Sequence, residues 1–344
     1  MSVSLLVILA FVVAFLASFA STPFARELAQ KVGAIDVPKD ARRMHKVPTP
    51  RLGGIAIFFG FVIALICFVV LTPEIIGIVA GSVFIVLMGA FDDRKPIKAW
   101  QKLLVQILAA LIVALCGVRI EIFTNPLLFS SKDYLLLGNL SIPVTVIWIV
   151  AITNAVNLID GLDGLAAGVA SISSVCLLVI ALMVSESNIA ILTACIAGAC
   201  FGFLPYNFNP ASIFMGDSGS NFLGFLLACV SIEGLFKGYA VISFAVPLLL
   251  LALPIFDTSV AILRRIKNKK PVMAPDRGHL HHKLVDMGFS QKQAVLILYG
   301  ISAVLGLSAI VLTGFGALRA ILLLAIALFA MLVSIYFFRE RKEK

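Results

Sequence analysis

Long apolar runs separated by short polar segments dominate the pattern of this chain. Eleven runs approach the length needed to cross about 30 Å of hydrocarbon. They cover residues 3–22, 53–71, 75–91, 103–118, 141–158, 166–184, 189–205, 219–236, 239–262, 293–312 and 318–338. This pattern predicts an all-α, polytopic membrane protein whose 344 residues form a single membrane domain.

Composition supports this class. The chain is 61% hydrophobic and 13% charged, and its mean hydropathy is +1.10. Soluble domains are nearer half apolar and a quarter charged, which excludes an ordinary soluble enzyme. The first run lacks a basic flank and is too long for a signal-peptide core, so we expect it to be a retained helix.

Basic residues predict the orientation. The segments 23–52, 92–102, 263–292 and 339–344 carry seven, four, eight and four Lys or Arg residues, which is 23 of the 27. Positive charge favours the cytoplasmic side, so eleven spans would put the N-terminus outside and the C-terminus in the cytoplasm. Every polar, motif-like segment then faces the cytoplasm. We expect this basic charge to meet membrane lipid headgroups, and we expect no nucleic-acid partner.

The segment "NAVNLIDGLDGLAAG" places polar groups between two apolar runs, where unpaired carboxylates are expensive. Asn154, Asn157 and Asp160 are spaced by three, so neighbours share a helix face. Gly161 and Gly164 predict a break that turns Asp160 and Asp163 toward one cavity. A solvated loop or an N-cap is the alternative, but it would need neither the two asparagines nor a second aspartate.

Two further segments carry carboxylates. In "FDDRKP", Asp92 and Asp93 point about 100° apart on a helix, so we expect one to face a site and the other to hold a neighbouring group. In "FMGDSGSNF", Asp217 lies at the entry to a helix that suits anions. A carboxylate and a phosphate coexist there if a cation such as Mg²⁺ lies between them.

The other polar segments offer groups for a bound anion. "YNFNP" and Phe214 supply Asn207 and aromatic faces that could stack on a base, although interfacial aromatics are often anchors. "PDRGHLHHKL" has too few metal ligands for a zinc site, so a phosphate-binding segment is the better interpretation. Beside the second run, prolines and glycines fix the backbone. The substrate-binding candidates from these segments are Lys46, Arg51, Asn154, Asn207, Phe214, Arg277, His279, His281 and His282.

In this order, "FDDRKP", "NAVNLIDGLDGLAAG", "PYNFNPASIFMGDSGS" and "PDRGHLHHKL" resemble the polyprenyl-phosphate N-acetylhexosamine-1-phosphate transferases of glycosyltransferase family 4. The resemblance covers about residues 36–290. It implies ten or eleven helices and transfer of a sugar 1-phosphate from a UDP-sugar to a polyprenyl phosphate. UMP would be released at the cytoplasmic face, and the reaction would require Mg²⁺ or Mn²⁺. Whether the protein forms a homodimer is left open.

The resemblance also implies roles for individual residues. Asp217 would be the leading metal ligand, with Asn157 or Asp160 sharing the ion. Asp92 and Asp93 match the family's paired aspartates, one of which has been proposed as a base toward the lipid phosphate. Asn207 and Phe214 would hold uridine, Lys46 the nucleotide end, and His279 with His281 the diphosphate. With Asp160 and Asp163, the aspartate pair completes our catalytic candidates.

Several alternatives stay open. In the muramoyl-pentapeptide branch of the family, three histidines run together, whereas Leu280 interrupts the run here and favours the N-acetylglucosamine branch. A transporter or flippase for a nucleotide-sugar or lipid-linked sugar would share the anion-binding groups, and a hydrolase would use water as acceptor. For a transferase, the lipid phosphate has a second pKa near 6 and is mostly dianionic at neutral pH, which favours direct attack with the aspartates positioning groups.

Overall fold

A computed structural model describes residues 2–38, 47–124, 134–235, 245–271 and 278–326 of the chain. The helices are α1 (Val3–Val32), α2 (Gly53–Phe68), α3 (Pro73–Arg94), α4 (Ala99–Leu115), α5 (Ser141–Ile159), α6 (Leu165–Met183), α7 (Ser187–Asn207), α8 (Gly216–Leu235), α9 (Ala245–Leu250), α10 (Ala252–Lys267), α11 (Leu280–Asp286) and α12 (Gln291–Phe315). A further helix, Ala317–Ile326, follows α12. Two short antiparallel hairpins pair β1 (Ile35–Asp36) with β2 (Thr49–Pro50) and β3 (Ile122–Thr124) with β4 (Tyr134–Leu136).

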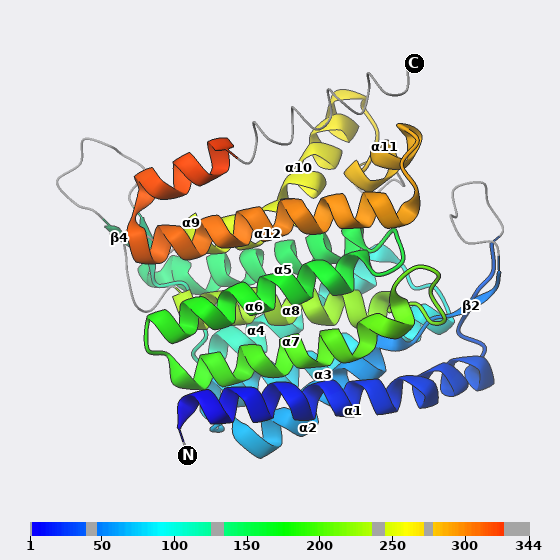
Figure 1. Ribbon diagram of the computed structural model, residues 1–344, viewed down its shortest axis with the longest axis horizontal. Coiled ribbons are helices and arrows are strands. Elements are labelled where there is room, and N and C mark those ends of the chain that lie inside the picture. The colour runs from blue at the N-terminus through cyan, green and yellow to red at the C-terminus, as the bar shows by residue number, and fades with distance from the viewer. Residues whose placement is uncertain (1, 39–46, 125–133, 236–244, 272–277, 327–344) are drawn as a thin grey trace.

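The long helices lie roughly side by side in a bundle, with α8 at its centre (Figure 1). Helix α8 packs against α2, α3, α5, α6 and α7, and its side chains from Phe222 to Val230 are buried. The β1–β2 hairpin and α11 lie at one end of the bundle, and the β3–β4 hairpin lies at the other.

Six helices are long and apolar enough to cross a membrane: α1, α3, α5 with the turn before it, α6, α7 and α12. Three shorter apolar helices are α2, α4 and Ala317–Ile326. These findings confirm an all-α, multi-pass membrane protein. The count of eleven crossings stays a prediction.

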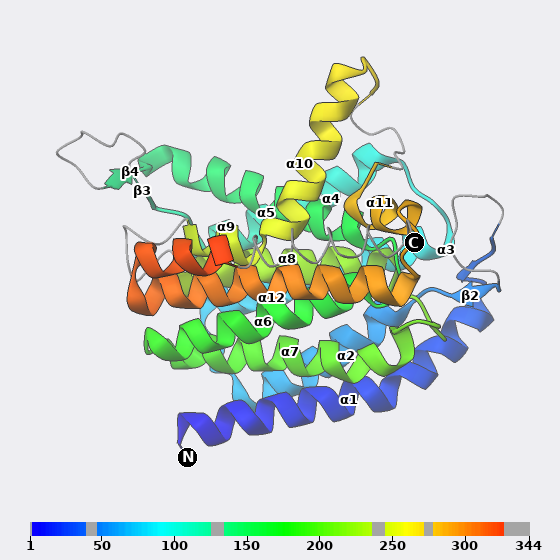
Figure 2. The same ribbon diagram turned by 45° about the horizontal axis from the view of Figure 1, so that its top comes forward.

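The apolar run 239–262 does not form one straight span in its described part, which corrects the sequence prediction. It is broken between α9 and α10 at Leu251. Pro254 explains the break, because its ring would clash with the carbonyl of Leu250 in a continuous helix. That carbonyl instead accepts a hydrogen bond from Ser173 Oγ at 3.0 Å. After the break, α10 leaves the bundle at a steep angle (Figure 2).

Small residues bring three helices together at the end of the bundle that carries the β1–β2 hairpin. A Cβ on Gly54 of α2 would overlap the backbone of Gly219 in α8, and one on Gly89 of α3 would overlap that of Ser218. Within a membrane, such contacts let helix backbones approach closely and pack by van der Waals attraction. The first turn of α8 is therefore held between α2 and α3.

The close contact between α2 and α8 predicts that a methyl group added at Gly54 lowers stability, whereas one added away from the contact does not. Gly54→Ala should destabilise the protein by about 1–3 kcal/mol, since the backbone of α8 would have to shift. Gly300→Ala is the matched control: it lies in α12, and the added Cβ would have nothing within 4 Å beyond its chain neighbours and the nearby backbone of its own helix. There alanine should be neutral or stabilise by up to about 1 kcal/mol. Thermal unfolding in detergent measures both, and an equal effect of the two changes would contradict the packing account.

Candidate functional site

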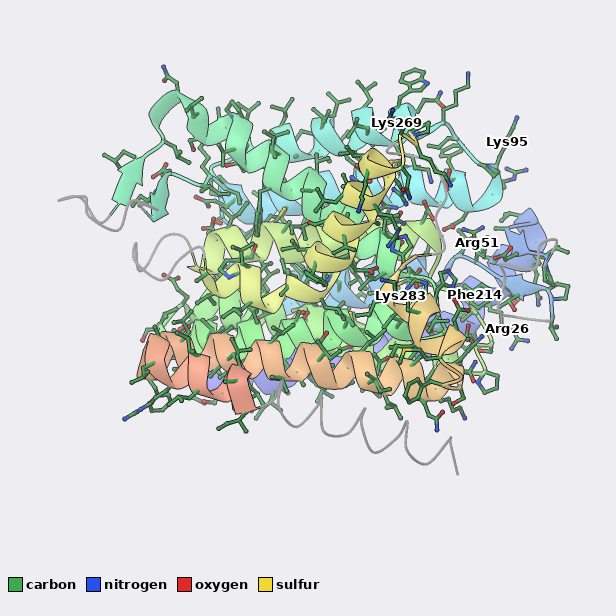
Figure 3. All side chains as sticks on the ribbon, turned by 90° about the horizontal axis from the view of Figure 1, so that it is seen from above. Arg26, Arg51, Lys95, Phe214, Lys269 and Lys283 are labelled. Atoms are coloured by element: carbon green, nitrogen blue, oxygen red, sulfur yellow. The ribbon has the colours of Figure 1, made fainter. Side chains whose placement is uncertain are left out.

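A polar cavity of about 330 Å³ opens at the end of the bundle where α5, α7 and α8 meet the β1–β2 hairpin. Its walls are Asp36, Arg51, Asn157, Asp160, Gly161, Leu162, Asp163, Asn207, Phe214, Met215, Gly216, Asp217 and His282. Figure 3 shows Arg51, Phe214 and Lys283 toward this end of the bundle, together with Arg26 and Lys95. The cavity thus combines carboxylates with a basic surrounding.

Backbone hydrogen bonds join two distant segments at this cavity. Gly53 N and Gly54 N, at the start of α2, donate to the carbonyls of Phe214 and Met215 at 3.0 and 2.9 Å. Phe214 N donates to Pro50 O at 2.8 Å. The first N–H groups of a helix have no partner inside it, so these contacts satisfy α2 and fix the loop before α8. They hold Arg51 and Phe214 next to each other at the cavity wall.

Asp93 caps the N-terminus of α8. Its carboxylate accepts hydrogen bonds from Asp217 N at 2.8 Å, Ser218 N at 3.0 Å and Ser218 Oγ at 2.8 Å. Gly216 has φ +72°, and a Cβ there would overlap this carboxylate. Arg51 Nη2 lies 3.4 Å from Asp93 Oδ1, so a cation also balances the buried charge.

Asp92 makes different contacts from its neighbour. One oxygen accepts from Ile97 N at 2.9 Å, and the other lies 2.6 Å from Lys102 Nζ. The same Nζ lies 2.6 Å from Asp217 Oδ2, while Arg51 Nη2 is 3.7 Å from Asp217 Oδ1. Lys102 therefore bridges Asp92 on α3 and Asp217 on α8. The two adjacent aspartates therefore contact different groups, and neither is among the residues that line the cavity.

The turn between α5 and α6 brings Asp160 and Asp163 to the cavity. Helix α5 ends at Ile159, and α6 begins after Gly164, whose φ is +81°. Burial and the negative charge of Asp217 raise the pKa of Asp160 to about 8. Asp163 Oδ2 accepts from Asn209 Nδ2 at 2.9 Å and Ala211 N at 3.0 Å, so it also fixes the loop before α8.

The two asparagines of α5 differ in position. Asn157 lines the cavity and donates to Ser220 Oγ at 2.8 Å. Asn154 lies outside the cavity lining, in an amide network. Its Nδ2 donates to Gln106 Oε1 at 2.6 Å, and Gln106 in turn donates to Asn221 Oδ1 at 2.9 Å. These bonds join α4, α5 and α8 beneath the carboxylates.

The three histidines of "HLHH" occupy three environments. His279 is buried, and its Nδ1 lies 2.8 Å from Asp257 Oδ2. His281 packs on Gly161, where a Cβ would overlap its ring. Burial, together with His282, lowers the pKa of His281 to about 3, which keeps that ring neutral at physiological pH. His282 is the histidine that lines the cavity.

Asn207 lines the cavity, and its side chain contains a buried acceptor without a partner. Its side chain is 3% exposed and donates through Nδ2 to Ile213 O at 3.0 Å. Its Oδ1 is buried and has no hydrogen-bond partner in the part of the chain that the structure describes. A buried acceptor without a partner costs about 1–3 kcal/mol, so this atom suits a ligand that donates an N–H or O–H.

Two substrate-binding candidates, Lys46 and Arg277, lie outside the described residues. The sequence analysis also missed two residues that the fold brings to the site. Lys102 was counted only as one of four basic charges in the segment 92–102. Asp36, which the structure places in β1 and in the cavity wall, was not named as a candidate.

Among the described residues, no group of three His, Cys, Asp or Glu side chains has the arrangement of a complete protein metal centre. Asn157, Asp160 and Asp217, which carry side-chain oxygens, nevertheless line one cavity. Mg²⁺ is commonly held by one or two carboxylates, with waters and substrate phosphates completing its shell. These oxygens fit that kind of partial site.

Comparison with known proteins identifies relatives along most of the chain. The sequence model of glycosyl transferase family 4 matches residues 75–235. A Bacillus subtilis (strain 168) protein named probable undecaprenyl-phosphate N-acetylglucosaminyl 1-phosphate transferase is 39% identical over 307 residues, 89% of this chain and 85% of the relative. A decaprenyl-phosphate N-acetylglucosaminephosphotransferase of Mycobacterium tuberculosis (strain ATCC 25618 / H37Rv) is 34% identical over 82% of this chain and 76% of its own length.

A more distant relative comes from Escherichia coli (strain K12). This undecaprenyl-phosphate alpha-N-acetylglucosaminyl 1-phosphate transferase is 27% identical over 80% of this chain and 75% of its own length. The names of all three relatives specify an N-acetylglucosamine phosphate group and a polyprenyl phosphate. The similarity therefore extends well beyond the segment matched by the family.

The cap at α8 predicts a large stability effect for one aspartate. Asp93→Asn should destabilise the protein by about 1–3 kcal/mol, because the amide places donors against the N–H groups of α8 and leaves Arg51 with less compensating charge. Asp286→Asn, at an exposed position in α11, is the control and should change stability by less than about 0.5 kcal/mol. Thermal unfolding without substrate measures both. Equal melting temperatures for Asp93→Asn and wild type would refute the capping role.

Proposed function

The chain belongs to glycosyl transferase family 4, and on this basis we propose that it is a polyprenyl-phosphate N-acetylglucosamine-1-phosphate transferase. It transfers N-acetylglucosamine 1-phosphate from a UDP-sugar to undecaprenyl phosphate, with release of UMP. This reaction is the first membrane step of a cell-envelope glycan. The relatives named for the same transfer support the N-acetylglucosamine branch over the muramoyl-pentapeptide branch.

The observation that carries the proposal is a charged cluster in a cavity that is also lined by Phe214 and by Asn207, whose buried Oδ1 has no partner among the described residues. Uracil has one ring N–H donor between two carbonyl acceptors, which suits the buried Oδ1 of Asn207. Phe214, beside Arg51 on the same wall, supplies a face for base stacking. The diphosphate would then extend toward Asp217 and His282, where charge is concentrated.

We propose Asp217 as the main ligand for Mg²⁺ or Mn²⁺, with Asn157 or Asp160 sharing the ion. Such an ion, when bound, neutralises phosphate charge and polarises the phosphorus under attack. A bound cation would favour the ionised form of Asp160, whose pKa burial raises to about 8. Arg51 and Lys102 are already paired with carboxylates. These two cations alone therefore do not neutralise the negative charge of two incoming phosphates.

The protein's own residues position the reactants for a direct displacement. The lipid phosphate is mostly dianionic at pH 7, so it needs little help from a base. Asp93 fixes the N-terminus of α8, and Asp92 holds Lys102 beside Asp217. The lipid phosphate oxygen attacks the sugar-bearing phosphorus, the bond to the UMP oxygen breaks, and UMP departs. Arg51, Lys102 and His282 would stabilise the charge that develops on the phosphoryl oxygens.

One assay tests the proposed activity against its competitors. Purified protein is incubated with Mg²⁺, a panel of UDP-sugars and either polyprenyl phosphate or no lipid acceptor. A transferase releases UMP and forms a lipid-linked sugar only when both substrates are present. A hydrolase would release UMP without the lipid, and a transporter or flippase would release none. Either of those outcomes would overturn the proposal.

Orientation gives a second prediction. We propose that the N-terminus lies outside and that the cavity opens to the cytoplasm, where UDP-sugars are available. In a background without native cysteines, a cysteine at Ser187 should therefore react with an impermeant reagent from outside. One at Lys269 should react only after the membrane is opened. Reversed labelling would place the cavity on the wrong side for its donor.

The metal assignment predicts a selective loss of turnover. Asp217→Asn should lower the rate of UMP release by at least about 100-fold, because Mg²⁺ prefers charged carboxylate oxygens at such a site. The Mg²⁺ concentration needed for half-maximal residual activity should also rise. Asp286→Asn is the control and should behave as wild type. Near-normal activity and Mg²⁺ response in Asp217→Asn would remove this residue from the metal role.

The aspartate pair predicts a flat pH response. If Asp92 or Asp93 served mainly as a base, its Asn variant would be most impaired at low pH. It would then recover above about pH 7, where the lipid phosphate ionises unaided. We expect instead a nearly constant loss from about pH 5.5 to 9, since both carboxylates position other groups. UMP release at saturating Mg²⁺ and lipid measures the profile. Recovery toward wild type at alkaline pH would establish the base role.

A further inference from the structure

We propose that Asp257, on α10, is a positioning residue that fixes the register of the segment from His279 to His282 and so directs His282 into the cavity. The inference deepens the proposed function and rests on it. Asp257 is an ionisable residue inside the apolar run 239–262, and the proposed transfer mechanism gives it no role. Its place in the fold suggests one.

Asp257 uses both carboxylate oxygens to hold one short stretch of chain. Oδ2 lies 2.8 Å from His279 Nδ1, and Oδ1 accepts from Leu280 N at 2.8 Å. Asp257 and His279 are 6% and 5% exposed. Because an ionised carboxylate only accepts hydrogen bonds, the hydrogen of His279 is on Nδ1. The pairing thus fixes the ring and the backbone at the start of α11 together.

The contact joins α10 to the start of α11. Helix α10 leaves the bundle, and α11 lies beside it in two views (Figures 1 and 2). Arg264 Nη1, also on α10, donates to Gly278 O at 3.0 Å, immediately before His279. Two side chains of α10 therefore hold residues 278–280.

The packed rings of His279, His281 and His282 link the contact at Asp257 to the cavity. The His279 and His281 rings stack with centroids 5.7 Å apart and planes 9° apart, and the His281 and His282 centroids are 4.3 Å apart. His281 is 3% exposed and sits against Gly161, in the same turn as Asp160 and Asp163. With His279 held by Asp257 and His281 seated on Gly161, His282 is the member of the segment that lines the cavity.

This arrangement separates the roles of the histidines. His279 faces Asp257 and does not line the cavity, so its contribution to transfer would pass through the placement of the segment. A side chain that keeps the donor to Asp257 should then replace much of its function. Asparagine does so, because its amide Nδ2 can take the place of the imidazole Nδ1.

The test compares kcat/KM for UMP release among matched variants. Asp257→Asn should lower it about 10-fold to 100-fold, the range for removing a side chain that orients a functional histidine. His279→Ala should show a similar loss, and His279→Asn should retain at least about tenfold more activity than His279→Ala. The double variant Asp257→Asn/His279→Ala should lose no more than about threefold beyond His279→Ala alone, because both changes break one contact. Asp286→Asn is the exposed control on α11.

Other outcomes would overturn the inference. These are wild-type kcat/KM in Asp257→Asn, full multiplication of the two losses in the double variant, or equal activity of His279→Asn and His279→Ala. If Asp257→Asn fails to fold, the comparison of the two His279 variants still decides.

A second readout needs no turnover. ¹⁵N NMR of histidine-labelled protein should show His279 protonated on Nδ1 in wild type and in the Asp286→Asn control, and shifted in Asp257→Asn. An unchanged signal in Asp257→Asn would refute the pairing. Absence of UMP release by wild type would instead overturn the proposed function, while this measurement would still test the contact.

Discussion

The buried carboxylate of Asp93 at the N-terminus of α8 is the interaction on which the site depends. A helix start without partners for its N–H groups is unstable inside a bundle, and a negative charge there satisfies both the donors and the dipole. Asp93 supplies that charge from α3 through three hydrogen bonds. Because Arg51 pairs with it from the start of α2, one carboxylate aligns three helices. Asp217 owes its place at the cavity to this alignment.

Charge balance explains why so many ionised groups can share one end of a membrane protein. Buried carboxylates are stable when cations lie close, and Lys102 and Arg51 fill this role for Asp92, Asp93 and Asp217. The balance also limits what these cations can offer a substrate. Each is already held by a carboxylate, so a reaction between two phosphates calls for added positive charge. The divalent cation that we propose at Asp217 would supply it.

Much of the fold follows from sequence pattern alone, because apolar runs of helical length and the glycines after Asp160 act locally. The break at Leu251 was missed because an apolar run conceals the effect of Pro254 on the preceding turn. Asn154 shows the limit for site residues: its spacing from Asn157 suggested a shared cavity, yet it pairs with Gln106 on α4. Lys102 could not be distinguished from other basic residues because its partners come from α3 and α8. Such long-range pairing carries no local signature.

The histidine segment shows how a motif can contain residues with unlike physical roles. Three imidazoles within four positions suggest a common grip on phosphate, but a helical turn points neighbouring side chains in different directions. One ring meets a carboxylate from α10, one is buried and neutral against Gly161, and one reaches the cavity. The leucine between the first two fits this division, because Leu280 offers its backbone N–H to Asp257 while its side chain packs against the apolar core. The segment is therefore held in place through His279 and His281, while His282 reaches the cavity. The position of His282 depends on the contacts of the two buried histidines.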